Sequence, residues 1–222
     1  MGDSSRPALQ EIHGASMNFA AWEPHYSEIL GYFGFDRARD EEAARLLASL
    51  MSRDNLISLA ALTCDNPVTV CGNAPCLKDE LDKIHGVVFA ADAAADVLDT
   101  HDIRPDAVFT DLDGATERLL GLNEEGTIVV VHAHGDNMAL LEHWVPRFKG
   151  PLVATTQGSP LPHVHNFGGF SDGDRAVFAA DELGARQITI IGFDLDDPDV
   201  GPVKRKKLFW AGKLLALIGH PV

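Results

Sequence analysis

Two carboxylates separated by a single residue, Asp111 and Asp113, have the spacing in this sequence that most directly suggests chemistry. They follow the short apolar segment 107–110, which is typical of a buried strand, and Gly114 comes next. In an extended chain, side chains two residues apart point to the same side, about 6.5 Å apart. Because open α/β sheets bind ligands at the carboxyl ends of their strands, we expect both carboxylates to hold one hard cation beside a phosphate. An acidic turn without a ligand is the alternative, since Asp and Gly are common turn residues.

Other predicted strands also end in an acidic residue, at Asp92, Asp136 and Asp194. In a parallel sheet these ends share one edge, where several carboxylates repel one another unless cations neutralise them. Mg²⁺ prefers oxygen ligands and commonly lies between carboxylates and substrate phosphates. We therefore predict a Mg²⁺ site among the strand-end carboxylates, which are Asp92, Asp111, Asp113, Asp136 and Asp194. Helix capping is the alternative role for each acid.

Two glycine-containing turns are candidate phosphate or substrate sites. Gly72 and Asn73 lie between a predicted strand and a predicted helix, where backbone N–H groups and the positive helix end can face a phosphate. The segment 166–175 is glycine-rich and then charged, and paired glycines allow a backbone to approach a ligand closely. The candidate binding residues of this second segment are Gly168, Gly169, Asp172, Asp174 and Arg175. A structural turn and a helix cap are the alternatives.

Histidine and lysine residues add weaker signals. His132 and His134 could ligate zinc, but neither has an obvious third partner, and the same holds for His163 and His165. His134 and Asp136 are candidate general bases, and the basic run 204–207 is either a solvated helix face or a phosphate contact.

The elements that must position these residues alternate between strand and helix from residue 67 onward. The pattern predicts strands at 67–71, 87–91, 107–110, 127–131, 151–155 and 187–191, and helices at 75–84, 93–101, 138–147, 173–183 and 204–218. Such alternation is typical of an α/β fold: a Rossmann-like, mostly parallel sheet with helices on both faces. Residues 1–62 predict a small helical N-terminal element broken near Pro24, Gly31 and Gly34, and residues 63–222 a catalytic domain.

Composition narrows the class of protein further. The chain has 222 residues, a formal charge of −15 and 45% hydrophobic residues, which favours a packed core and disfavours nucleic acid and anionic lipid as partners. No apolar stretch approaches the length of a membrane span. The 3 cysteines have no framework spacing, so we expect free thiols in a reducing cytoplasm.

Seven strings, taken in order, make the chain resemble a known family. They are G-N-A-P-C-L, A-D-A-A-A, P-D-A-V-F-T-D-L-D-G, V-V-H-A-H-G-D-N, T-T-Q, N-F-G-G-F-S-D-G-D-R-A and I-G-F-D. From about residue 67 to the C-terminal basic helix, the chain is similar to the archaeal-type 6-hydroxymethyl-7,8-dihydropterin pyrophosphokinases, which look related to thiamin pyrophosphokinases.

The resemblance implies transfer of a pyrophosphoryl group from ATP to the hydroxymethyl group of a reduced pterin, with release of AMP, in tetrahydromethanopterin or folate-type cofactor biosynthesis. It also implies Mg²⁺ and a homodimer. By position, Asp111 and Asp113 become the primary metal ligands, Asp92 and Asp136 further metal-binding acids, and Asp172 lies beside the nucleotide or the acceptor. Asn137 and Gln157 fall within the matching strings and join the candidate binding residues.

Three alternatives remain at this stage. Thiamin could be the acceptor for the same chemistry, because the catalytic carboxylates face ATP and do not distinguish acceptors. The D-x-D string 111–113 also fits a metal-dependent glycosyltransferase. A regulatory nucleotide-binding module would need the glycine turns but not the acids.

Overall fold

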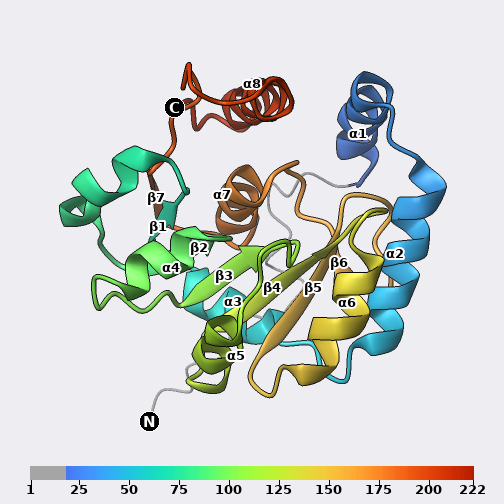
Figure 1. Ribbon diagram of the computed structural model, residues 1–222, viewed down its shortest axis with the longest axis horizontal. Helices are drawn as coiled ribbons and strands as arrows, with labels where there is room; N and C mark the ends of the chain where they lie inside the picture. Colours follow the sequence, from blue (N-terminus) through green and yellow to red (C-terminus); the bar gives the residue numbers. More distant parts are fainter. Residues whose placement is uncertain (1–18) are drawn as a thin grey trace, which may run out of the picture.

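A seven-stranded parallel sheet forms the centre of the structure, a computed structural model that describes residues 19–222 (Figure 1). The strand order is β6-β5-β4-β3-β2-β1-β7, and every neighbouring pair is parallel. The strands are β1 (Pro67–Cys71), β2 (Val87–Ala91), β3 (Ala107–Thr110), β4 (Ile128–Ala133), β5 (Leu152–Thr156), β6 (Val164–His165) and β7 (Gln187–Ile191). The predicted α/β fold is confirmed, and all the strand ends that carry acids share one edge.

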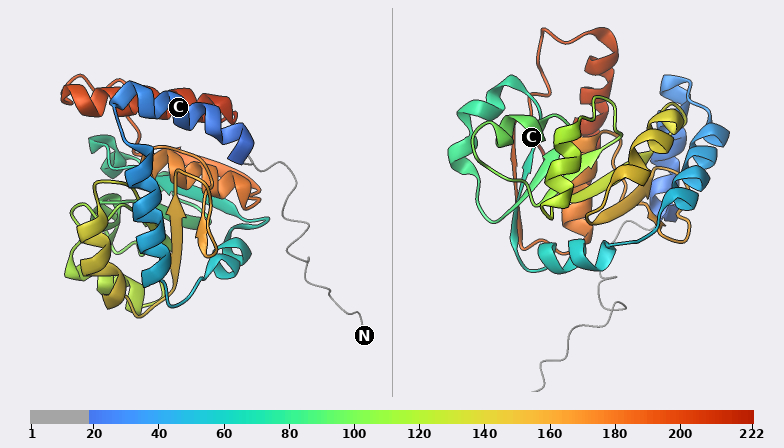
Figure 2. Two further views of the ribbon diagram at one scale, coloured as in Figure 1. Left: turned by 90° about the vertical axis from the view of Figure 1, so that its right-hand side faces the viewer. Right: turned by 60° about the horizontal axis from the view of Figure 1, so that its bottom comes forward.

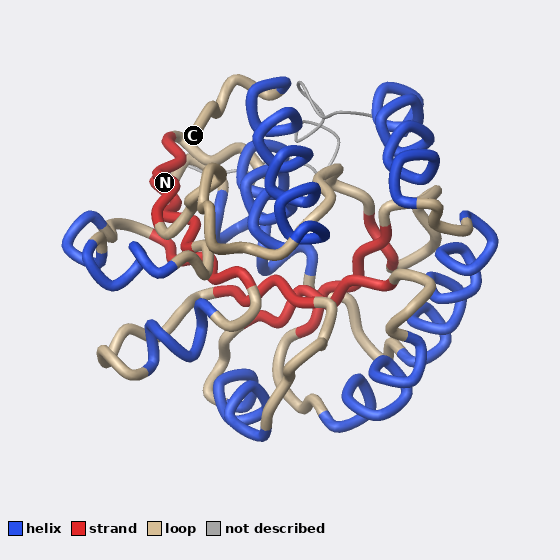
Figure 3. Tube along the Cα trace, turned by 45° about the horizontal axis from the view of Figure 1, so that its top comes forward, coloured by secondary structure: helices blue, strands red, loops and turns tan. Residues whose placement is uncertain are grey.

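Buried side chains alternate between the two faces of the sheet, as the period of a β-strand requires. In β4, Ile128 and Val130 pack into one hydrophobic cluster, whereas Val129 and Val131 pack into the other. A sheet that is apolar on both faces must be covered on both. Figure 3 shows the strands as one layer with helices on either side.

Two sets of helices cover these faces. One core contains residues of α1 (Phe19–Phe33), α3 (Leu56–Thr63), α7 (Asp172–Glu182) and α8 (Pro202–Leu217). The other contains residues of α2 (Arg37–Leu50), α4 (Ala94–Asp99), α5 (Glu117–Glu124) and α6 (Met138–Trp144). Helix α7 lies directly on the sheet, and α1 and α8 form a further layer outside it (Figure 2). An edge-on ring contact joins α1 to α7, Trp22 to Phe178 at 6.2 Å, and another joins α1 to α8 within the outer layer, Tyr32 to Trp210 at 5.8 Å.

The N-terminal helices belong to the same cores as the rest of the chain. Residues on both sides of the predicted boundary at 62/63 share each hydrophobic cluster, so the division into two parts stays a prediction. The expected break at Pro24 and Gly31 is wrong: α1 runs through both residues and ends just before Gly34, whose φ is +74°. Residues 1–18 of the predicted element lie outside the described part of the chain.

Other boundaries also differ from prediction. Residues 75–84 form two short 3₁₀ helices, η1 (Pro75–Asp79) and η2 (Leu81–Lys83), in place of one α-helix. Glu80 lies between these two helices, and its carboxylate accepts a hydrogen bond from the Gly192 N–H just after β7. This contact holds segment 75–84 against the end of β7. Strand β4 continues two residues beyond the predicted end and includes His132. The predicted helix 138–147 divides into α6 and a 3₁₀ turn, η3 (Val145–Arg147), and α5 and β6 are additional to the predicted elements.

Candidate active site

Three carboxylates from distant parts of the chain meet at the carboxyl edge of the sheet. Asp92 follows β2, Asp111 follows β3, and Asp172 begins α7, with one oxygen of each lying within 4.8 Å of the others. Helix α7 packs across β1, β2 and β3, and this crossing brings its first residue to the strand ends. Oxygen ligands at this separation suit a hard divalent cation.

The hydroxyl of Thr110 fixes the local shape of the cluster. It donates to Asp92 Oδ1 at 2.8 Å and accepts the Leu112 N–H at 2.9 Å. Leu112 is fully buried with a φ of +69°, so the chain is not extended from Asp111 to Asp113 as the sequence suggested. The left-handed residue turns Asp113 away: its side chain is exposed, and its N–H donates to Asp111 Oδ1 at 3.0 Å.

The titration behaviour of the three acids fits a cation site. Burial raises the pKa of Asp92 and Asp172, and the neighbouring carboxylate of Asp111 raises both further. Burial also opposes ionisation of Asp111, but hydrogen bonds from His134 and from the Asp113 N–H outweigh it and lower its pKa to about 2. One carboxylate is thus held ionised beside two that ionise reluctantly, an imbalance that a bound cation relieves.

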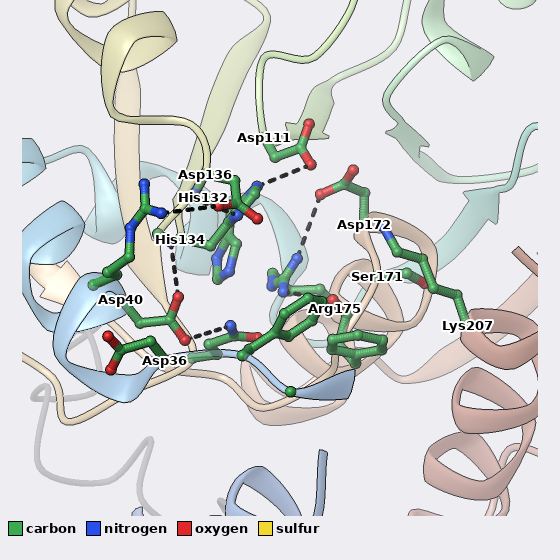
Figure 4. Close-up of a pocket in the computed structure, with 16 residues that line it drawn as sticks. Asp36, Asp40, Asp111, His132, His134, Asp136, Ser171, Asp172, Arg175 and Lys207 are labelled. Atoms are coloured by element: carbon green, nitrogen blue, oxygen red, sulfur yellow. Dashed lines mark hydrogen bonds and ion pairs between the residues drawn. The ribbon is translucent and has the colours of Figure 1, made fainter. Parts of the chain in front are cut away.

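A pocket of about 330 Å³ opens beside Asp111 and Asp172 (Figure 4). Its wall combines the loop before α2, the start of α2, the ends of β3, β4 and β5, the start of α7 and one residue of α8. The lining residues that carry polar or aromatic groups are Phe35, Asp36, Arg39, Asp40, Asp111, His132, His134, Asp136, Gln157, Phe170, Ser171, Asp172, Arg175 and Lys207.

The loop after β4 contacts the three-acid cluster through His134 and connects the ends of β3 and β4 through Asn137. His134 Nε2 lies 3.4 Å from Asp111 Oδ2, and its Nδ1 accepts the Asp136 N–H at 3.3 Å. Asn137 is 2% exposed and donates to the carbonyl oxygens of Asp111 and His132, so it ties the ends of β3 and β4 together. Asp136 is exposed at the pocket, 3.8 Å from Arg39, and is not part of the three-acid cluster.

The start of α7 is held by a capping box. The Asp174 carboxylate accepts the N–H groups of Phe170 and Ser171, and the Ser171 hydroxyl also contacts it. Asp174 is fully buried and outside the pocket lining. Arg175 is 4% exposed, lies 3.4 Å from Asp172, donates to the Phe170 carbonyl, and lines the pocket.

The paired glycines of this loop are explained by packing against α7. A Cβ on Gly168 would lie 2.6 Å from the Phe178 ring, and a Cβ on Gly169 would lie 2.5 Å from Arg175 Cα. Both glycines have positive φ, and both lie outside the pocket lining. Their close approach is thus to the helix, and their predicted ligand contact stays a prediction.

The predicted residues that follow β1 and β7 lie at the other end of the edge. Gly72 and Asn73 follow β1, where the N–H groups of Gly72 and Ala74 bond to carbonyls at the end of β7. Asp194 is exposed beyond β7, and Lys207 is the residue of the basic run 204–207 that lines the pocket. Because η1 has only five residues, the expected phosphate site at a helix N-terminus has no regular helix behind it.

Sequence reasoning missed the buried Asp40 and considered the buried His132 only as a possible zinc ligand. The Asp40 carboxylate accepts from Tyr26 Oη, Gln157 Nε2 and the Gly135 N–H, each at 2.8 Å, and so joins α1 and α2 to the ends of β4 and β5. His132 continues the alternation of Ile128 and Val130, so counting residues by two along β4 could have placed it on the α7 face. No local pattern marks Asp40, which looks like one more acid in a charged helix.

The fold and site define an α/β protein with a cluster of acidic residues, suited to a hard cation, beside a pocket at the carboxyl edge of the sheet, an arrangement suited to phosphoryl-group transfer. A family model described as "6-hydroxymethylpterin diphosphokinase MptE-like" matches residues 43–200, and the chain belongs to this family. Among the described residues, no helix has the length and apolar character needed to cross a membrane.

Similar curated proteins carry one name, 6-hydroxymethyl-7,8-dihydropterin pyrophosphokinase. The Methanothermobacter thermautotrophicus protein is 36% identical over 219 residues, covering 90% of this chain and 94% of its own length. The Pyrococcus furiosus protein is 40% identical over 219 residues, covering 90% and 93%. The Methanocaldococcus jannaschii protein is 32% identical over 193 residues, covering 80% of each.

Proposed function

We propose that this protein transfers a pyrophosphoryl group from ATP to 6-hydroxymethyl-7,8-dihydropterin. The hydroxymethyl oxygen attacks the β-phosphorus of ATP, the bond from that phosphorus to the α,β-bridging oxygen breaks, and AMP leaves with that oxygen. The hydroxymethyl proton passes to a base or to solvent. The observation that carries this proposal is the three-acid cluster beside the pocket, in a chain that belongs to the diphosphokinase family. The product is a pterin diphosphate for cofactor biosynthesis.

We propose Asp92, Asp111 and Asp172 as the residues that hold Mg²⁺. The cation, when bound, neutralises charge on the phosphate oxygens and favours attack at phosphorus. The protein positions the ligands: Thr110 holds Asp92, His134 keeps Asp111 ionised, and the capped start of α7 presents Asp172.

Asp113 and Asp136 remain predicted ligands that the cluster does not include, so the two sets can be compared directly. We expect Asp172→Asn to raise the Mg²⁺ concentration needed for half-maximal turnover by at least about tenfold, since it removes one of three charged ligands. Asp113→Asn is the matched change on an exposed carboxylate. A larger effect at Asp113 than at Asp172 would restore the ligand set predicted from spacing.

Proton transfer has two candidate bases. Both ring nitrogens of His134 have partners, Asp111 on one side and the Asp136 N–H on the other. The carboxylate of Asp136 faces the pocket, where its neighbour is Arg39. We therefore assign His134 to positioning Asp111, and keep Asp136 as the candidate base.

Assembly and location rest on separate support. We propose a homodimer on the basis of the family resemblance alone. Sedimentation velocity, which measures the mass of the particle in solution, tests this proposal. A reducing cytoplasm is supported by the free thiols of Cys64, Cys71 and Cys76, since disulfides are rare there.

The decisive experiment measures AMP release from ATP and Mg²⁺, with the pterin and thiamin offered in parallel. We expect AMP with the pterin alone, and a loss of about 10³-fold in turnover for Asp111→Asn. AMP with thiamin alone would overturn the acceptor but keep the chemistry, whereas no AMP with either would overturn the proposed reaction.

A further inference from the structure

The side chain of His132 is buried at the floor of the pocket and has an unsatisfied ring nitrogen. It is 2% exposed, lies at the carboxyl end of β4, and lines the pocket together with Arg175 and Gln157. Within residues 19–222, its buried Nε2 atom has no hydrogen-bond partner. Buried polar atoms almost always have partners, so an orphan in a pocket wall indicates that a ligand supplies one. Figure 4 shows His132 and Arg175 beside the same space.

The hydrogen bonds around His132 assign its tautomer. Its Nδ1 lies 3.1 Å from Thr155 Oγ1, and the Thr155 hydroxyl donates its proton to the Val131 carbonyl at 3.1 Å. A hydroxyl has one proton, so Thr155 accepts from the Nδ1–H of the imidazole. The neutral ring then carries its lone pair on Nε2, which makes that atom a hydrogen-bond acceptor. Burial and the nearby Arg175 lower the pKa of His132 well below its usual value, which keeps the ring neutral.

The walls around His132 favour a flat, uncharged ligand over a triphosphate. The rings of Phe35 and Phe170 lie 6.4 Å apart and both line the pocket. Acids dominate the charged lining: it contains Asp36, Asp40, Asp111, Asp136 and Asp172 against Arg39, Arg175 and Lys207. Lys207 stands on the side of Ser171 and Asp172, whereas Asp36 and Asp40 lie across the pocket from it (Figure 4). The phosphates therefore fit the Lys207 side, and a neutral ring fits the α2 side.

The short distance between His132 and the three-acid cluster favours the pterin over adenine as the ring that contacts His132. His134 contacts Asp111, and the ring centroids of His132 and His134 are 6.2 Å apart. Only the His134 ring therefore separates His132 from the three-acid cluster. The attacking oxygen of the acceptor is one methylene group from its ring. Adenine, in contrast, is separated from the β-phosphorus by the ribose and the α-phosphate.

We propose that His132 is a specificity residue for the acceptor, and that its Nε2 accepts a hydrogen bond from a ring N–H of the dihydropterin. This inference rests on the proposed function, which supplies the acceptor. Thr155 acts as a positioning residue, because its oxygen selects the tautomer that exposes the Nε2 lone pair to the pocket.

The test compares two substitutions that separate the ring nitrogens. His132→Asn keeps an N–H near the Nδ1 position for Thr155 and removes the acceptor at Nε2, whereas His132→Gln places an amide oxygen near Nε2. We expect His132→Asn to raise the KM for the pterin about tenfold, with the KM for ATP and kcat changed less than twofold, and His132→Gln to recover most of the loss. His143→Asn, on the exposed face of α6, is the matched control with wild-type constants.

Direct binding keeps this test independent of turnover. Calorimetry of the pterin with a non-hydrolysable ATP analogue and Mg²⁺ measures the same tenfold loss, even if the wild-type protein releases no AMP. Thr155→Val is the second variant should His132→Asn fail to fold, and we expect a rise of about threefold in the pterin KM alone. A rise in the ATP KM, a fall in kcat with both KM values unchanged, or wild-type pterin binding by the folded variants overturns the assignment.

Discussion

Replacing Asp92 with Asn should make the metal-free protein more stable and its stability insensitive to Mg²⁺. The Asp92 carboxylate lies within 4.8 Å of both Asp111 and Asp172. Two unit charges at that distance repel by about 3.5 kcal/mol at an effective dielectric constant of about 20. Asn keeps the shape, can accept from Thr110 through its amide oxygen, and tolerates the φ of +47° at this position.

The expected gain is smaller than the sum of two such repulsions, because a carboxyl group with a raised pKa escapes part of the cost by binding a proton. We expect about 1–2 kcal/mol at pH 7, which corresponds to a rise of about 2–8 °C in Tm for a protein of this size. Burial raises the pKa of Asp92 in the fold, so the wild type loses stability as pH rises above the ordinary value of 3.8. The stability advantage of Asp92→Asn should therefore be present at pH 7 and should vanish below about pH 3.8, where the wild-type carboxyl group is protonated in both states.

Thermal unfolding in EDTA and in Mg²⁺ measures both effects. At ten times its dissociation constant, Mg²⁺ stabilises the wild type by about 1.4 kcal/mol, and Asp92→Asn should gain little. Asp102→Asn is the matched control, an exposed Asp that also has a positive φ of 57° and lies outside the cluster. A lower Tm of Asp92→Asn in EDTA would refute the repulsion argument. An equal rise in Tm on adding Mg²⁺ for the wild type and for Asp92→Asn would refute the cation site at Asp92.

Three further substitutions test the supports of the site. Thr110→Val removes the hydroxyl that holds Asp92 and the Leu112 N–H, and should lower kcat about tenfold while raising the Mg²⁺ requirement; an unchanged Mg²⁺ titration would contradict this role. Ser171→Ala removes the N-cap of α7 and should cost about 1 kcal/mol, a fall of about 2–4 °C in Tm, and an unchanged Tm would show that Asp174 alone caps the helix. Tyr26→Phe removes one of three donors to the buried Asp40 and should cost about 1 kcal/mol in a urea titration, with no loss expected only if the Asp40 bond is not formed.

Local patterns predicted most of the fold. Strands β1 to β5 and β7 are runs of apolar and β-branched residues bounded by turns. Almost all side chains of β1 to β5 are buried, whereas β7 lies at the edge of the sheet and most of its side chains are only half-buried. A parallel strand between two helical layers has this composition wherever it occurs, so the chain itself carries the signal. The exception is the segment 75–84, where contacts with the end of β7 accompany two 3₁₀ turns in place of a helix.

The candidate site was only partly visible in the sequence. Asp92 and Asp111 follow strands directly, and parallel pairing was enough to place them at one edge. Asp113 was expected beside Asp111 because the chain was taken as extended, but Leu112 adopts a left-handed conformation supported by burial and by Thr110. A single residue at positive φ reverses the direction of the next side chain, and sequence spacing does not report it.

The amino-acid sequence by itself determined the class of fold, the acidic edge and the family, because strand periodicity and contiguous motifs are local properties of a chain. Only the tertiary structure decided which groups meet. Asp172 joins Asp111 because α7 crosses the sheet after a loop of buried glycines, and Asp40 reaches Gln157 because α2 packs against β5. His132 lines the pocket because residues of α2 and α7 come together beside the end of β4. These juxtapositions join segments far apart in the chain, and packing, rather than residue spacing, sets their distances.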